Sequence, residues 1–567
     1  MIRSNFHVFA GLLALSIAVW AAPAMLAQQR RRQPATPARS AQGAQVEKPS
    51  ALLEEAAGLL QARKLDEALA VARRAVAASP RDSDGHGLLG VILDQQGQAA
   101  EAEREYLEAL RLNPAGVSAR ANLGVLLART NRADEAIKAF ETVLRAAPAH
   151  AQATINLAAL YAARGDYQKA IPLLERATNF GPQSAVVVSG TDISLLLALN
   201  NAYVRAGRAK DSARLTEAIE GAAGDDARVL FTLGVQMAEA HEYERAATLF
   251  ERTNALRPNT AEVLYNLGLA LYNLDQLDKS ARALEAAAAL APNESEPLYR
   301  LGLIASARGQ SEAALDYWLK ALRLRAEFPE ANFMIGEELF KNGRDENAAQ
   351  FYERAIAQDP SKLVYYIRLG ATHFRHRRYA QAREVYERAA RRFPDSAEIH
   401  YLVGYAARGE GMYDDALAAF ERALKLKPDY ADALANLGFI ATARGRDEEA
   451  EKFLRRALAI DAKNFPAYYD LGRLLVRLKR YEEAVPLLEG AARMSGHDPG
   501  IHYQLFTAYS RLKRKTDAER ELALFKQLEE GRKKGEGMSG GSATQDTSPS
   551  TDALPPPATN NAAPKSP

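Results

Sequence analysis

A Leu-Gly pair, or a close variant of it, returns through most of this chain every 34 residues. The stretch AEVLYNLGLALYNLDQLDKSARALEAAAALAP holds one copy, Leu267 and Gly268, in a pattern that otherwise predicts a helix. A glycine inside a helix costs about 1 kcal/mol relative to alanine, so its regular return needs a structural reason. The same glycine recurs at Gly90, Gly124, Gly234, Gly302, Gly336, Gly370, Gly404, Gly438 and Gly472.

Three further residue types follow the glycine at fixed distances in most copies. In one copy they are the small Ala246, the bulky Phe250 one turn later, and Pro258 at the end. We expect the glycine and the alanine to lie in two successive helices, where small side chains let the backbones approach. Because proline cannot continue a helix, it ends one unit before the next begins. A repeat of paired helices with this period predicts a solenoid.

These positions resemble the tetratricopeptide repeat family, whose marks are Leu-Gly, a later small Ala, an aromatic residue and a terminal Pro. The resemblance implies an all-α, right-handed superhelical solenoid of about fourteen 34-residue helix-turn-helix repeats. We expect repeats 1–4 over residues 49–184 and repeats 5–14 over residues 193–530. Ala158 and Asn200 occupy successive glycine sites but are spaced too widely, which indicates an insertion at residues 185–192. It is either a longer loop or a hinge.

The two ends of the chain differ from the repeats. Arg3, an apolar run from Val8 to Trp20 and small residues behind it predict a signal peptide over residues 1–27. We therefore expect an exported protein, periplasmic or secreted. Because Arg30, Arg31 and Arg32 follow at once, an uncleaved N-terminal membrane anchor is the alternative. Composition predicts a disordered linker at 28–48 and a disordered tail at 531–567.

Composition and motifs argue against several functions. Lys plus Arg is 73 and Asp plus Glu is 71, and this balance is unlike that of a nucleic-acid binder. The absence of Cys excludes disulfides and thiolate sites. No motif of a metalloprotease, a P-loop or a serine hydrolase is present. We predict no enzyme activity, no cofactor, no metal and no small-molecule substrate. His373 and His376 lack a third ligand, so we interpret them as packing residues.

The remaining candidate site is the inner wall, which the first helix of each pair lines. In the family, the inward positions include the two residues before the Leu-Gly pair. The candidate partner-binding residues at these positions are Asn122, Asn156, Tyr265, Asn266, Tyr299, Arg300, Arg368, Tyr401, Asn436 and Tyr469. An Asn amide both donates and accepts, so it can pair with the backbone of any peptide. Rigid aromatic side chains and Arg are typical of interface hot spots.

Two other roles for these residues stay open. The Asn series is similar to the asparagine ladder of some long tetratricopeptide superhelices that bind extended peptides. The same amides could instead cap or bridge neighbouring helices, and the aromatic side chains could pack between adjacent first helices.

Together these features predict a non-catalytic exported scaffold that binds protein or peptide partners on its concave face. The alternative is a periplasmic adaptor in an envelope assembly for secretion, pilus formation or exopolysaccharide export. Packing of two arrays end to end would give a homo-oligomer, and a retained anchor would place the array in a membrane-associated complex.

Overall fold

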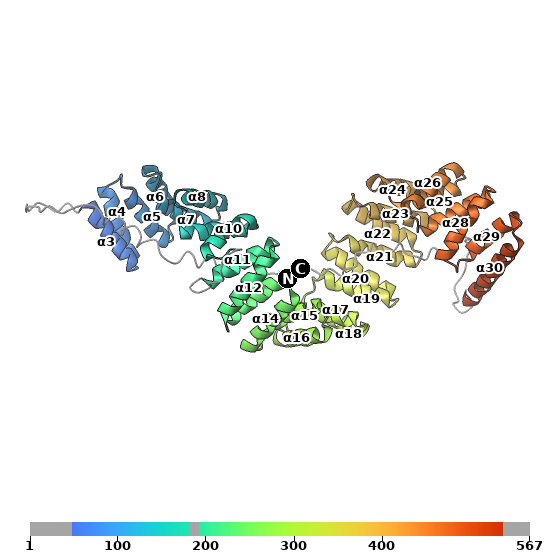
Figure 1. Ribbon diagram of the computed structural model, residues 1–567, viewed down its shortest axis with the longest axis horizontal. Helices are drawn as coiled ribbons and strands as arrows, with labels where there is room; N and C mark the ends of the chain where they lie inside the picture. The colour runs from blue at the N-terminus through green and yellow to red at the C-terminus, as the bar shows by residue number, and fades with distance from the viewer. Residues whose placement is uncertain (1–47, 182–191, 537–567) are drawn as a thin grey trace, which may run out of the picture. The chain divides into compact units, whose positions relative to one another are not determined.

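The computed structural model describes residues 48–181 and 192–536, and these residues form 28 α-helices (Figure 1). Contacts within the chain divide it into two compact units, Met1–Leu290 and Ala291–Ser566. The predicted all-α solenoid of paired-helix repeats is confirmed, with about fourteen pairs. The predicted signal peptide at 1–27 lies outside the described residues, as do the linker up to residue 47 and the insertion up to residue 191.

The first unit contains seven helix pairs, each joined by a short turn. Its helices are α3 (Pro49–Gln61), α4 (Leu65–Ala78), α5 (Ser83–Gln95), α6 (Ala99–Leu112), α7 (Val117–Arg129), α8 (Ala133–Ala146), α9 (Ala151–Ala163), α10 (Tyr167–Thr178), α11 (Ile193–Arg205), α12 (Ala209–Ala223), α13 (Ala227–Glu239), α14 (Tyr243–Leu256), α15 (Ala261–Asn273) and α16 (Leu277–Leu290).

The second unit contains the other seven pairs. Its helices are α17 (Ser295–Ala307), α18 (Ser311–Leu324), α19 (Pro329–Lys341), α20 (Asp345–Gln358), α21 (Leu363–Arg375), α22 (Tyr379–Arg392), α23 (Ala397–Gly409), α24 (Tyr413–Leu426), α25 (Ala431–Ala443), α26 (Asp447–Ile460), α27 (Phe465–Arg477), α28 (Tyr481–Met494), α29 (Pro499–Arg511) and α30 (Lys515–Glu536). The last helix therefore continues past residue 530, where we expected the disordered tail to begin.

The turn inside each pair contains one residue with a positive φ, which ends the first helix in a left-handed conformation. Glycine adopts this conformation without strain, and it fills the position at Gly97, Gly165, Gly207, Gly309, Gly343, Gly411 and Gly445. The other pairs use Arg63, Asn131, His241, Asp275, Arg377, Lys479 and Lys513. These residues let a turn of only three residues reverse the chain.

The repeated glycine faces the bulky residue of the second helix in its own pair. A Cβ atom on Gly268 would lie 2.6 Å from Cγ of Leu284, and one on Gly336 would lie 2.6 Å from Cε1 of Tyr352. These distances are far below an ordinary van der Waals contact. The glycine is thus required chiefly because a large buried side chain lies against its backbone.

One pair replaces this apolar contact with a buried polar network. Asn200 stands at the glycine site of α11 and is fully buried. Its Nδ2 donates to Oε1 of Gln236 at 2.7 Å, and its Oδ1 accepts from Oγ of Ser212 at 2.9 Å. The bulky site opposite holds the smaller Thr216, which leaves room for the amide. Every polar atom of Asn200 is therefore paired, as burial requires.

Candidate partner-binding site

The first helices of the pairs lie closer to one another than the second helices do. In the first unit, direct contacts join α3 to α5, α5 to α7, α7 to α9, α11 to α13 and α13 to α15. In the second unit they join α25 to α27 and α27 to α29. No two second helices in the described residues contact each other as extensively. Within each unit, the first helices therefore form the inner side of the curved stack.

We define the inner face as the first-helix surface that holds the residues two and three positions before the glycine site. Helical periodicity places the residues one and four positions after the glycine on the same stripe. All ten predicted partner-binding residues belong to first helices. Their exposure differs from repeat to repeat.

In the first unit, the four predicted residues are all half-buried. Asn122 lies on α7, and Asn156 on α9 accepts a hydrogen bond from Nε2 of Gln152 at 3.1 Å. On α15, Tyr265 and Asn266 lie side by side. Nδ2 of Asn266 donates to the carbonyl of Glu262 at 2.8 Å, one turn earlier. This bond fixes the amide plane and leaves Oδ1 of Asn266 as an acceptor.

In the second unit, three predicted residues are half-buried. The Tyr299 ring packs on Phe328 with the centroids 4.8 Å apart, and the Arg300 guanidinium lies 5.7 Å from the Tyr299 ring. Arg368 forms an ion pair with Glu337 at 3.1 Å.

The Glu337 carboxylate, which pairs with Arg368, also accepts a hydrogen bond from Oη of the buried Tyr352 at 2.6 Å. Burial raises the pKa of Glu337, and the charge of Arg368 acts in the opposite direction. The positive charge of Arg368 therefore neutralises the partly buried carboxylate of Glu337.

The prediction of partner contact is wrong for Tyr401, Asn436 and Tyr469, because all three are buried, with exposed fractions of 5%, 5% and 4%. Tyr401 packs among other rings, 5.0 Å from Tyr430 and 5.8 Å from Tyr405. Tyr430 directly precedes α25, so the alternative of packing against the next repeat describes Tyr401. Tyr469 stacks on Phe465 of its own helix, α27, with the centroids 6.4 Å apart.

Sequence reasoning missed the inner-face residues that follow the glycine. The Phe374 and Tyr405 rings stack with their centroids 4.9 Å apart, which joins α21 to α23. Arg408, Phe439 and Arg473 continue this series across α23, α25 and α27. A signal was available, because these residues lie one and four positions after the glycine and so share a helical stripe with the predicted positions.

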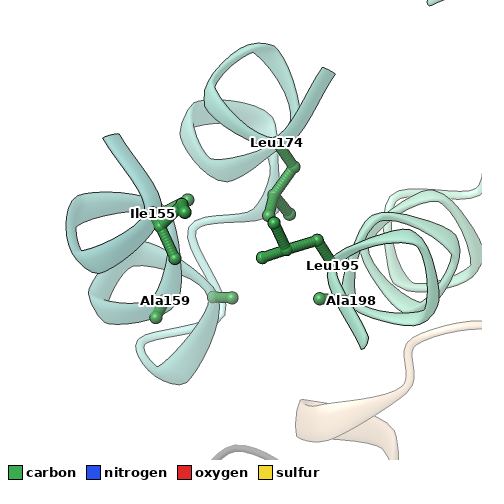
Figure 2. A pocket seen from close by; sticks show the side chains of 7 residues that line it. Ile155, Ala159, Leu174, Leu195 and Ala198 are labelled. Atoms are coloured by element: carbon green, nitrogen blue, oxygen red, sulfur yellow. The ribbon is translucent and has the colours of Figure 1, made fainter. Parts of the chain in front are cut away.

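A small apolar cavity lies in the first unit between α9, α10 and α11 (Figure 2). Ile155 and Ala159 face it from α9, Leu174 from α10, and Leu195 and Ala198 from α11. Its volume of about 10 Å³ is room for about one water molecule. We therefore interpret it as a packing defect and not as a ligand site.

The two histidines of α21 and its turn do not form a metal site. Nε2 of His376 lies 2.6 Å from Oδ2 of Asp345. Burial lowers the pKa of His373, as expected for a ring packed between helices. Among residues 48–181 and 192–536, no group of three or more His, Asp or Glu side chains could hold a metal ion.

Comparison with protein families identifies the repeat. Residues 53–117, 92–141 and 122–185 match one tetratricopeptide repeat model, and residues 261–294 match another. The chain is a tetratricopeptide repeat (TPR) protein. Residues 321–544 are also similar to the C-terminal domain of cilia and flagella-associated protein 70, which the model describes as a TPR domain. TPR domains bind protein partners, and families of this type are typically non-catalytic, so the chain is a protein-binding scaffold.

Several solved structures share parts of the fold. The C-terminal part of a TPR repeat-containing protein from Cytophaga hutchinsonii is 17% identical, covering 42% of this chain and 99% of that chain with a TM-score of 0.39. Yeast Tom70 is 17% identical over 84% of this chain and 96% of its own, with a TM-score of 0.31. YrrB, described as a TPR protein with an unusual peptide-binding site, is 23% identical over 33% and 96%, with a TM-score of 0.30. Scores this low support no transfer of function.

Among proteins of curated function, none matches this chain. The domain that residues 321–544 resemble belongs to a protein of cilia and flagella, not to a protein of the periplasm. The predictions of export, of a periplasmic or secreted location, and of the membrane-anchored alternative are therefore wrong, and so is that of a periplasmic envelope adaptor. Within residues 48–181 and 192–536, no helix is both long and apolar enough to cross a membrane.

Proposed function

We propose that the inner face of the first helices binds extended segments of protein partners. The observation that carries this proposal is the way in which Asn266 is held. Its Nδ2 is bonded to the Glu262 carbonyl one turn earlier at 2.8 Å. This bond fixes the amide so that Oδ1 remains as an acceptor. A fixed acceptor can take the backbone N–H of a peptide without reference to its side chains.

The neighbouring aromatic and cationic side chains would supply the rest of the binding energy. Tyr265 lies beside Asn266 on α15, and the pair Tyr299 and Arg300 holds the equivalent positions on α17. All four side chains are half-buried, so they are ordered and still have surface to offer. Ordered aromatic side chains lose little conformational entropy when they are covered by a partner.

The test uses the full chain to select binders from a library of random peptides. A selected peptide is then measured against wild type and against the Tyr265→Ala/Asn266→Ala double variant. We expect the double variant to weaken binding by about tenfold or more, since hot-spot truncations often cost over 1 kcal/mol. The matched control is Arg282→Ala/Glu285→Ala on α16, where both side chains are exposed on the second helix of the same pair.

Circular dichroism separates binding from folding in this experiment. The proposal requires the double variant to keep the helicity and the melting temperature of wild type. A large loss of melting temperature would mean that Tyr265 and Asn266 are packing residues. Equal loss of binding in both double variants would place the peptide elsewhere than on the inner face.

A further inference from the structure

One segment of the inner face in the second unit carries a guanidinium group between two aromatic rings. Cζ of Arg408 lies 4.9 Å from the centroid of the Tyr405 ring and 4.8 Å from that of the Phe439 ring. Tyr405 and Arg408 belong to α23, and Phe439 belongs to α25, so the contact bridges two repeats. Stacking on two rings fixes the plane of the guanidinium and leaves its N–H groups directed along that plane.

Arg408 forms no direct ion pair with a described residue, although its charge acts on the buried carboxylate of Asp470. Within the part of the chain that the structure describes, its guanidinium makes the two ring contacts and no ion pair or hydrogen bond. Other Arg side chains of the second unit pair directly with a carboxylate, for example Arg383 with Glu410 at 2.6 Å and Arg388 with Glu353 at 2.8 Å. The donors of a half-buried, ordered Arg408 are therefore unused.

The charge on the other side of Phe439 does not compensate Arg408. The Arg473 guanidinium lies 5.8 Å from the same ring, and Nη2 of Arg473 pairs with Oδ1 of Asp470 at 3.2 Å. One aromatic ring is thus flanked by two guanidinium groups that share a single neighbouring carboxylate. This segment keeps one excess positive charge, and a low-dielectric wall strengthens its attraction for a negative group.

The group that this segment lacks is therefore a carboxylate paired directly with Arg408. A peptide that carries an acidic side chain supplies it. Arginine and aromatic rings also stack on nucleic-acid bases, but the net charge of the chain is only +2, which favours a protein ligand.

We propose that Arg408, Phe439 and Arg473 form a subsite for an Asp or Glu side chain of a bound protein segment. The proposal deepens the function proposed above and rests on it. In the complex, Arg408 donates two parallel hydrogen bonds to the carboxylate while its faces stay stacked on Tyr405 and Phe439.

The test measures fluorescence anisotropy of labelled probes with the full chain at low salt. The probes are decapeptides of alternating Glu and Ala, of alternating Gln and Ala, and of alternating Lys and Ala, together with a ten-nucleotide oligothymidylate. We expect the Glu peptide to bind about tenfold or more tightly than the Gln peptide. Arg408→Gln should abolish this preference, and Arg408→Lys should restore only part of it, because an ammonium cannot donate in the bidentate geometry.

The matched control is Arg422→Gln, which removes the same charge from an exposed position on the second helix α24. It should leave the preference for the Glu peptide unchanged within about twofold, since an exposed charge is screened. Hydrogen exchange of wild type provides a readout that needs no variant. The Glu peptide should protect α23 and α25 more than it protects α24 and α26.

The two levels of the proposal fail in different ways. Equal affinity for the Glu and Gln peptides, with protection on α23 and α25, refutes the acidic subsite and leaves inner-face binding standing. Protection confined to the second helices, or no binding by any peptide, refutes both. Tighter binding of the oligothymidylate would assign the ring-stacked Arg408 to nucleic acid, and equal losses in Arg408→Gln and Arg422→Gln would reduce the effect to general charge.

Discussion

Substitution of Gly336 by alanine tests the reason given for the repeated glycine. The added Cβ would lie 2.6 Å from Cε1 and 2.7 Å from Cδ1 of Tyr352. Ordinary van der Waals contact begins about 1 Å further away. The Tyr352 ring has little freedom to move, because it is fully buried and its Oη donates to Glu337 at 2.6 Å.

Two opposing terms set the size of the effect. Overpacking a dense core costs about 1–3 kcal/mol, whereas alanine gains about 1 kcal/mol over glycine in helix propensity. The net cost is therefore about 1 kcal/mol and reaches about 2 kcal/mol if the ring cannot shift. Since solenoids open locally, we expect amide exchange in α19 and α20 to accelerate by about 5–30-fold.

Gly87→Ala is the matched control, because Gly87 also lies inside a helix, α5, and a Cβ there would meet nothing within 4 Å. Only the propensity term applies, so exchange around α5 should slow by about fivefold. Hydrogen exchange with mass spectrometry at peptide resolution measures both variants. If both substitutions slowed exchange, the close approach of Tyr352 would not be the reason for the glycine.

Two further predictions concern buried polar groups. Burial raises the pKa of the Asp470 carboxyl from 3.8 to about 6. The folded chain therefore binds this proton more tightly than the unfolded chain, and the resulting stabilisation is complete below the lower value and is lost as pH rises through the higher one. The C-terminal repeats should lose about 2–3 kcal/mol over that range, and Asp470→Asn should flatten this part of a stability-against-pH curve obtained from denaturant unfolding. Asn200→Ala leaves Oε1 of Gln236 without its donor, so it should lower the free energy of unfolding by about 1–3 kcal/mol in the same measurement. The control Asn201→Ala, at the half-exposed neighbour, should change it by less than about 0.5 kcal/mol. Similar losses in the two variants would argue against the buried network.

The repeat could be predicted from the sequence because its signals are local. The glycine, the small residue, the bulky residue and the proline each act within one helix pair, so their spacing alone specifies paired helices. The order and type of the elements followed from that spacing. The end of the last helix did not, because the predicted tail begins at residue 531 but α30 reaches Glu536.

The binding residues were harder to predict, because exposure depends on neighbouring repeats. Tyr265 and Tyr401 hold the same position in the repeat, yet Tyr265 is half-buried and Tyr401 is enclosed by Tyr405, Phe420 and Tyr430. A position within a repeat fixes the direction of a side chain. It does not specify which side chains from the next repeat cover it.

The sequence by itself determined the solenoid, because its period-34 pattern is satisfied only by stacked helix pairs. Only the tertiary structure decided how each position is used. It showed that Gly336 makes room for the Tyr352 ring, that Asn200 belongs to a buried network, and that Arg408 lies stacked between rings without a direct ion pair to any described residue. The physical reason is that burial, pairing and stacking arise between helices, where side chains from different repeats meet.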